Sequence, residues 1–256
     1  MARPLLDPPC IGWREDLPAP EELPTLVPSL GFDSPNHMNE VYLEMPRASW
    51  QARGFLIWLA PIGGLCSIVM LIALIWGWDS TDLWLFLGFG PAGILTCLWI
   101  TCWMLKSSIA APRDLPLRFN RTRRRIYAYN FKERWWNPFE RWYVAPVAYD
   151  WSQVRAERWR QISASTHGVI IRVGVVLSIV APGTNKVIDR FHLSTMGADE
   201  HAWAYICTYM QKGPEALPPP DPPQDHNDVP WYNLAMRLAP KVQWPEDMDR
   251  ESRTAP

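Results

Sequence analysis

The sequence predicts a membrane α-helical hairpin followed by an α+β domain, in which an antiparallel sheet or roll is closed by a C-terminal helix. Three observations predict this fold class. Two apolar runs without a charged residue occupy positions 54–78 and 83–105. Short segments of alternating apolar and polar residues, separated by turn signals, then continue to about position 193. One amphipathic segment, 198–211, completes the region.

Each apolar run is longer than the roughly 20 residues with which a helix crosses the hydrocarbon core of a bilayer. Buried helices of a soluble protein are the alternative, but uncharged core helices of this length are rare. Tryptophans favour the headgroup level. They lie mostly toward the ends of the runs, as Trp58, Trp76, Trp78, Trp84, Trp99 and Trp103. We therefore expect two transmembrane helices within residues 53–105.

The connection between the runs, residues 79–82, is too short for anything but an antiparallel hairpin, so both tails of the chain are expected on one side of the membrane. Arg47 and Arg53 precede the first run, and seven basic residues follow the second before position 126. The connection itself holds two aspartates and no basic residue. By the positive-inside rule, both termini are expected in the cytoplasm.

Helix breakers and small residues interrupt both runs, at Pro61, Gly63, Gly64 and 88–93. They could open a groove or a pore, but they also let two helices approach closely and kink. The structural interpretation is favoured, because neither run holds an ionisable residue that could serve ion or proton transport.

The segment RFNRTRRRIY, residues 118–127, contains five arginines: Arg118, Arg121, Arg123, Arg124 and Arg125. The whole chain of 256 residues has a net charge of −1, so global steering toward nucleic acid is not expected. Anionic lipid, an acidic protein partner and the acidic tails of the chain stay open as partners. Because each basic residue near headgroups contributes about 1 kcal/mol, most of the cluster is interpreted as a topology signal beside the second run.

Charge is unevenly distributed along the chain. Residues 1–50 form a proline-rich arm with a net charge of −5, and residues 214–256 form a proline-rich tail with a net charge of −4. Between them, residues 106–213 carry seventeen basic and eight acidic side chains outside the predicted spans. We expect an extended arm, which Trp13 or residues 26–30 could dock in part, and a tail with a short amphipathic turn at 231–240. Both could fold back on the basic middle.

A second candidate contact site for lipid or a partner is KERWWNPFERW, residues 132–142, called the tryptophan loop below. It includes Trp135, Trp136, Arg141 and Trp142. Two interpretations stay open: a loop that dips into the inner leaflet or grips a partner, or tryptophans packed beneath the sheet. Single-stranded nucleic-acid binding is disfavoured, because the predicted hairpin holds the loop near the bilayer and no RNA-binding signature is present.

Strand signals fill residues 106–193. PLRFN and RIYAYNF flank residues 121–123 like the arms of a β-hairpin. Further strands are expected in RWYVAPVAYDW, VRAERWRQI, GVIIRVGVVLSIVAP and KVIDRFHL, and the third of these is long enough for one bent strand or two short ones. Strands followed by one helix are similar in layout to bacterial pleckstrin-homology-like modules that follow membrane hairpins.

No residue pattern nominates an enzyme. The five cysteines fit neither a disulfide scaffold nor a metal site, and His167, His192 and His201 stand at no ligand or triad spacing. Nucleophile-elbow, phosphate-loop and zinc-protease motifs are missing from the sequence. We therefore expect no catalytic residue, no cofactor and no metal.

The order of two predicted spans, RDLPLRFNRTRRRIYAYNF from Arg113 and YDWSQVRAE from Tyr149 resembles an uncharacterised proteobacterial membrane family over residues 49–210. The positions that carry the resemblance are Pro116, Arg118, Phe119, Asn120, Arg121, Arg124, Tyr127 and Trp151. Members are often encoded beside type VI secretion or polymorphic toxin effectors, so the resemblance implies an immunity or accessory role. We expect a bacterial inner-membrane protein that acts by binding a cognate toxin. The alternative is a membrane-surface lipid-binding or scaffold module without a toxin partner.

Overall fold

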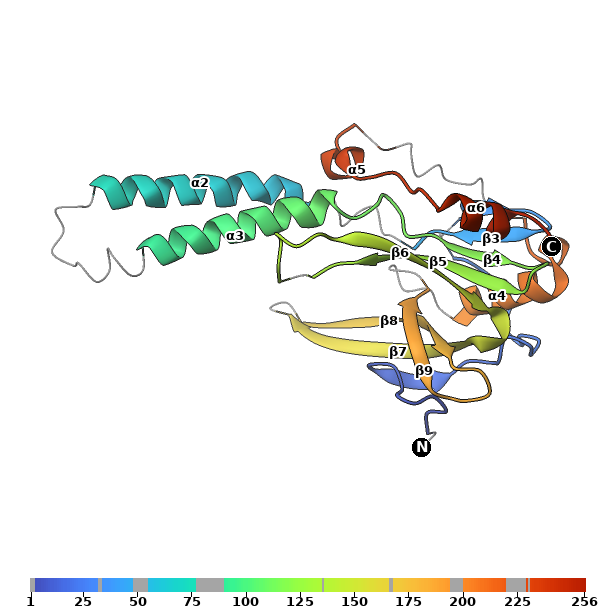
Figure 1. Cartoon of the computed structure of the whole chain (residues 1–256). Coiled ribbons are helices and arrows are strands. Elements are labelled where there is room, and N and C mark those ends of the chain that lie inside the picture. Colours follow the sequence, from blue (N-terminus) through green and yellow to red (C-terminus); the bar gives the residue numbers. More distant parts are fainter. Residues whose placement is uncertain are drawn as a thin grey trace.

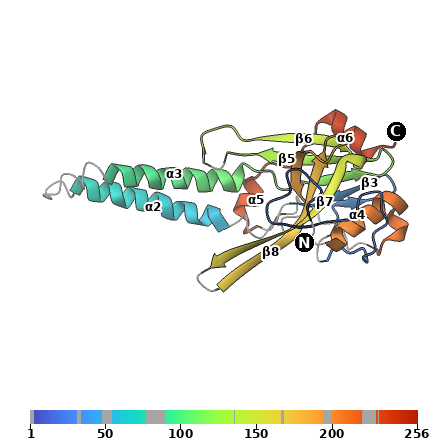
Figure 2. The same ribbon diagram turned by 90° about the horizontal axis from the view of Figure 1, so that it is seen from below.

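The computed structural model describes residues 3–31, 34–47, 55–76, 90–134, 136–165, 168–193, 200–219, 229 and 231–256. A pair of long helices projects from one end of a β-rich body, and the C-terminus lies at the opposite end (Figure 1). The view from below shows the same arrangement (Figure 2). The term β-rich body is used here for all described residues outside the two long helices.

The long helices α2 (Phe55–Trp76) and α3 (Gly90–Ile109) lie side by side. Both are long and apolar enough to cross a membrane, and few of their residues are buried. Two apolar helices are thus confirmed. α3 continues past the predicted end at 105, since the first helix breaker beyond it is Pro112. The predicted connection 79–82 lies outside the described residues.

Small residues bring α2 and α3 together, as the sequence predicted. A Cβ atom added to Gly63 would lie 2.6 Å from the Thr101 hydroxyl oxygen, so the two helices meet closely there. The hydroxyl of Thr101 donates to the Cys97 carbonyl at 2.8 Å, and the hydroxyl of Ser67 donates to the Gly63 carbonyl at 2.9 Å. Both hydroxyls are therefore satisfied within their own helix.

The body contains two sheets whose neighbouring strands run antiparallel. The five-stranded sheet has the order β2 (His37–Met38), β3 (Tyr42–Met45), β4 (Leu117–Asn120), β5 (Arg125–Lys132), β6 (Tyr143–Asp150). The four-stranded sheet has the order β1 (Trp13–Asp16), β7 (Val154–Ser165), β8 (Gly168–Val180), β9 (Val187–His192). A single 3-10 turn, Trp151–Gln153, leads from the first sheet into the second.

The six strands from β4 to β9 lie where strands were predicted, and β4 and β5 form the predicted hairpin. β8 is one strand of 13 residues. β1, β2 and β3 were not predicted. They belong to the acidic arm, which is therefore not a separate extended segment: Tyr42 pairs with Asn120 and Met45 pairs with Leu117. Strands this short form through pairing with distant segments, which leaves little local signal.

Helix α4 (Glu200–Lys212) occupies the predicted helical segment and buries nine of its thirteen residues, including the predicted face of Trp203, Ile206, Cys207 and Met210. It packs against β4 and β8. The ring of Trp203 lies 5.5 Å from that of Trp151, which lies 6.0 Å from the ring of Phe119. The hydrophobic core is built from both sheets and this helix. The pleckstrin-homology-like layout stays a prediction.

The described residues of both tails pack against the strands and helices between them. The Trp203 indole donates to the Pro18 carbonyl at 3.0 Å, and the Gln211 amide donates to the Pro20 carbonyl at 3.0 Å, so α4 fixes the arm. The C-terminal tail includes the 3-10 turn Pro214–Ala216, α5 (Leu234–Leu238) and α6 (Glu246–Arg253). α5 coincides with the predicted amphipathic turn and packs against α3, while α6 packs against β4.

Candidate functional site

The arginine-rich turn, residues 118–125, joins β4 to β5 and is shaped by Asn120. The side-chain oxygen of Asn120 accepts from the Thr122 hydroxyl at 2.9 Å and from the Arg123 amide at 2.8 Å. Asparagine commonly supports turns in this way. Arg124 takes a left-handed conformation with φ of 52°, which closes the turn into β5.

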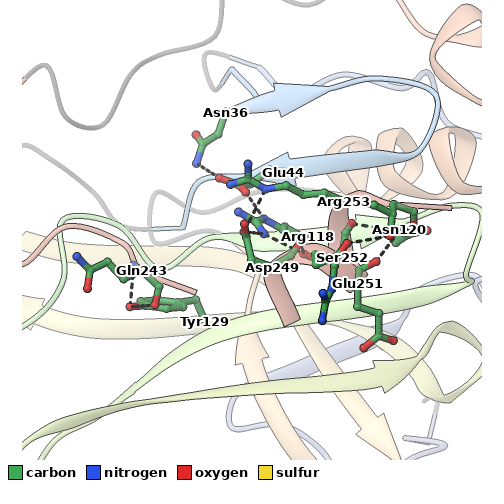
Figure 3. Close-up of polar contacts among 12 residues, drawn as sticks. Asn36, Glu44, Arg118, Asn120, Tyr129, Gln243, Asp249, Glu251, Ser252 and Arg253 are labelled. Atoms are coloured by element: carbon green, nitrogen blue, oxygen red, sulfur yellow. Dashed lines mark hydrogen bonds and ion pairs between the residues drawn. The ribbon is translucent and has the colours of Figure 1, made fainter. Parts of the chain in front are cut away.

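Arg118 is buried in the five-stranded sheet and faces two carboxylates (Figure 3). Its Nε atom pairs with Glu44 of β3, and its Nη1 atom lies 2.6 Å from Asp249 Oδ1 and 2.8 Å from Ser252 Oγ of α6. The guanidinium also lies over the Trp244 ring, 4.5 Å from its centroid. A buried cation requires such partners, since burial without them is costly.

The rest of the C-terminal tail is held by main-chain and ionic contacts to the same turn. The Asn120 amide nitrogen donates to the carbonyls of Ser252 and Thr254, at 3.0 and 3.1 Å. Arg123 donates to the carbonyls of Thr254 and Ala255, at 3.0 and 2.9 Å. Arg125 pairs with Glu251 at 2.7 Å and with Asp150 at 3.3 Å. The contacts that this turn makes to the tail therefore come from Arg118, Asn120, Arg123 and Arg125.

The two remaining arginines face the acidic arm and the carboxyl end of α4. Arg124 donates to the Met210 carbonyl at 3.1 Å and pairs with Glu21 at 3.3 Å. Arg121 pairs with Glu40 at 3.2 Å. A cation near the carboxyl end of a helix also interacts favourably with the helix dipole. All five arginines of the turn are thus engaged by the chain's own acidic or carbonyl groups.

The arginine-rich turn lies at the end of the body opposite α2 and α3, beside the C-terminus (Figure 1). This differs from the interpretation of the cluster as a signal held near headgroups beside the second run. The reason is geometric: after α3 ends at Ile109, the chain runs through residues 110–116 and the extended strand β4 before it reaches the turn. An extended chain covers roughly 3.3 Å per residue. Sequence proximity to the helix does not translate into spatial proximity.

The described residues of the tryptophan loop differ in burial, so each of the two interpretations left open by the sequence fits some of them. Trp142 is buried, and its indole donates to the Asn137 carbonyl at 3.3 Å. Lys106 at the end of α3 lies over the Trp142 ring, 4.9 Å from its centroid. Trp136 and Arg141, in contrast, are exposed. Trp135 lies outside the described residues.

The structure therefore does not bring all candidate contact residues together. The five arginines gather at one end of the body, while the loop containing Trp136, Arg141 and Trp142 contacts the base of α3 at the other end. Sequence reasoning missed the partners of Arg118, which are Glu44, Trp244, Asp249 and Ser252. The excess of acids in the two tails was the available signal.

Cys10 and Cys207 have buried thiols, and a thiol is a potential nucleophile. Burial raises the pKa of Cys10 to about 12, and burial also raises the pKa of Cys207 to about 12. Both thiols are therefore protonated near neutral pH and are weak nucleophiles. Within the described part of the chain, no three His, Cys, Asp or Glu side chains gather as metal ligands would.

The sequence matches the model of a known protein family. The model of DUF6708, a family of unknown function, matches residues 94–234, which is more than half of the chain. The chain belongs to the DUF6708 family. The DUF6708 match begins within α3, covers β4 to β9 and α4, and ends at the start of α5. No curated protein and no solved structure matches the chain.

Proposed function

We propose that this DUF6708 protein is an integral protein of a bacterial inner membrane, with α2 and α3 spanning the bilayer and the β-rich body and both termini in the cytoplasm. The observation that carries the proposal is the projection of two exposed, apolar helices from one end of the body. The body acts by binding another protein and not by catalysis.

The surface of the helices supports a lipid environment. Large apolar side chains that water would otherwise contact include Trp58, Ile62, Leu65, Ile68, Val69, Leu71, Ile72, Ile75, Leu95 and Leu98. A soluble monomer rarely exposes so large a contiguous apolar surface. The helix hydroxyls also suit a bilayer, because polar groups in hydrocarbon must be satisfied internally. Thr96 donates to the Ala92 carbonyl at 2.8 Å, as Ser67 and Thr101 do within their helices.

Alkaline extraction and topology reporters test the anchor. The full chain is expected to remain with membranes after carbonate washing. A periplasmic reporter inserted at position 80 is expected to be active, and a cytoplasmic reporter fused after position 256 is expected to be active as well. Extraction of the chain by carbonate, or a periplasmic C-terminus, would contradict the proposal.

In its specific form, the proposal makes the chain an immunity protein that neutralises a cognate secreted toxin by contact. The support is the resemblance of the segment from Arg113 to Phe131 to membrane proteins encoded beside such effectors. The test is growth of bacteria that express the neighbouring gene product with and without this chain. Rescue of growth and co-purification from membranes are expected, and toxicity without rescue would exclude immunity.

A further inference from the structure

The hairpin formed by β7 and β8 extends beyond the sheet that holds its base. At its described tip, residues 161–165 and 168–173, five aliphatic side chains are exposed: Ile162, Val169, Ile170, Ile171 and Val173. Closer to the base, the residues of β8 from Val175 to Val180 are buried. The tip is therefore an apolar surface that no other described segment of the chain covers.

The aliphatic side chains favour one face of the tip. Ile162 is opposite Ile171 in the register of the hairpin, and Val169 and Val173 lie two positions from Ile171 on the same strand. Side chains two apart on a strand, and those directly opposite, share a face. The other face is more polar and includes Gln161, Ser163 and Arg172, with Ile170 as its one aliphatic residue among the described side chains. The tip is thus amphipathic.

The tip points in the same direction as the helical pair. In both views the free end of β7 and β8 reaches the level of the bases of α2 and α3 (Figures 1 and 2). The free end of β5 and β6 does the same, and it carries the exposed Phe139 and Trp136. Beside α3, α5 is preceded by the exposed Trp231 and Tyr232. Aromatic residues of this kind favour the headgroup level of a bilayer.

We propose that the β7–β8 tip inserts into the cytoplasmic headgroup layer of the bilayer that α2 and α3 cross. The body then contacts the membrane through this tip in addition to the two helices. This inference depends on the proposed membrane anchor and adds lipid as a ligand of the body. Its contact surface is the aliphatic face of the tip. Arg172, on the opposite face, is placed to meet lipid phosphate groups.

The depth of insertion follows from the backbone of the tip. β1 pairs with β7 only up to Trp159, so the outer edge of β7 has no strand partner at the tip among the described residues. Unpaired amide and carbonyl groups are not tolerated in the hydrocarbon core, but they are tolerated among hydrated headgroups. The tip therefore lies at the interface and does not span the bilayer.

Environment-sensitive labels on the full-length chain test this placement. A cysteine-free background receives single cysteines at three positions: Ile171→Cys at the tip, Ile188→Cys on β9, and the native Cys66 restored in α2. Ile171 and Ile188 are matched in exposure, at 51% and 53%, but β9 lies away from the helical pair (Figure 1). Each variant carries a nitrobenzoxadiazole label and is reconstituted in phosphatidylethanolamine and phosphatidylglycerol vesicles. Lipids with a spin label near the headgroup or deep in the chain serve as quenchers.

The label at 171 is expected to emit at shorter wavelength than the label at 188, and to be quenched at least twofold more by the shallow quencher than by the deep one. A label at 171 that behaves like the one at 188, while the label at 66 is quenched, overturns the inference and leaves the anchor intact. An unquenched label at 66 overturns the anchor itself. A wavelength shift at 171 that appears in detergent and grows with protein concentration would instead assign the tip to contact between copies.

Discussion

Arg118 on β4 and Asp249 on α6 form an ion pair with 2.6 Å between Nη1 and Oδ1, although they are 131 positions apart in the sequence. The arginine is almost completely buried, while the aspartate is one-third exposed. Glu44 of β3 provides the second carboxylate. One cation therefore joins the acidic arm, the central strand and helix α6 of the C-terminal tail.

Arg118→Ala should release the C-terminal tail. The change removes the buried cation that Glu44 and Asp249 share, and Asp249 keeps only its pairing with the half-exposed Arg253 at 3.1 Å. Breaking a buried ion pair costs roughly 3–5 kcal/mol. We expect a loss of unfolding free energy of that order in detergent-solubilised protein, together with fast hydrogen exchange across residues 246–254. Urea denaturation and hydrogen-exchange mass spectrometry measure the two effects.

The matched control for this change is Arg134→Ala. Arg134 also pairs with a glutamate, Glu140, at 3.1 Å, but its side chain is 60% exposed. Exposed pairs contribute about 0–1 kcal/mol. Equal stability losses in the two variants, or a tail that stays protected without Arg118, would refute the role assigned to the buried cation.

The strands that could be predicted are those with local signals. Alternating residues in Arg125–Lys132 and the turn residues Pro182–Asn185 define their strands without reference to the rest of the chain. β3, in contrast, has four residues and exists because β4 lies beside it. β4 has a local signal through its hairpin with β5, but the partner of β3 lies on the far side of the helical pair in the sequence. Residues 42–45 therefore have no local strand signal of their own, and sequence reasoning assigned residues 1–50 to an extended arm.

The candidate site was predicted in part for a similar reason. Five arginines in ten residues mark a place where anions bind, and the acidic tails were among the partners considered. The sequence does not show where each arginine side chain points. Arg118 reaches Asp249 of α6, whereas Arg124 reaches the Met210 carbonyl near the end of α4. The tryptophan loop also combines opposite environments, because Trp142 is buried while Trp136 is exposed.

Gly63→Leu should separate the two long helices. A side chain at this position meets the Thr101 hydroxyl at 2.6 Å and must push α3 away. Overpacking of this kind costs typically 1–3 kcal/mol. Gly64→Leu is the control, since a Cβ atom there meets no atom of another described segment within 4 Å. Thermal unfolding in detergent should show a lower midpoint for the first variant only, and indistinguishable midpoints would contradict the close approach.

Tyr209→Phe should change how stability depends on alkaline pH. Burial raises the pKa of Tyr209 above its usual value, and its hydroxyl donates to the Asn39 carbonyl at 2.7 Å. The folded state therefore keeps a proton that the unfolded state loses above about pH 10, so stability falls as pH rises through that range.

Urea midpoints at pH 8 and pH 11 measure this effect. At pH 8 the variant should be less stable by about 1 kcal/mol, the usual contribution of one hydrogen bond. At pH 11 the difference should shrink, because the variant has no phenol to ionise at this position. Tyr232→Phe, which changes an exposed phenol, should follow the wild-type protein at both values. A difference that stays constant or widens with pH would count against the assignment.

Glu157→Ala should release the N-terminal segment from the four-stranded sheet. The buried carboxylate of Glu157 accepts from the Cys10 amide at 2.9 Å, pairs with Arg190 at 3.2 Å and also accepts from the Ser178 hydroxyl. Without it, several buried donors lose their acceptor, at a cost of roughly 3 kcal/mol. Cys10 is buried and its pKa is raised to about 12, so its alkylation reports on release.

The rate of Cys10 alkylation by a maleimide, followed by peptide mass spectrometry, provides the measurement. We expect at least a tenfold faster reaction in Glu157→Ala than in the wild-type protein, because the thiol becomes accessible and its pKa returns toward the usual value. Glu15→Ala is the control. It removes a carboxylate of β1 that pairs with Arg158 of β7 at the surface, and it should leave the alkylation rate of Cys10 unchanged. If Cys10 reacts equally slowly in all three proteins, the N-terminal segment is held by contacts other than Glu157, such as the pairing of Asp7 with Lys186.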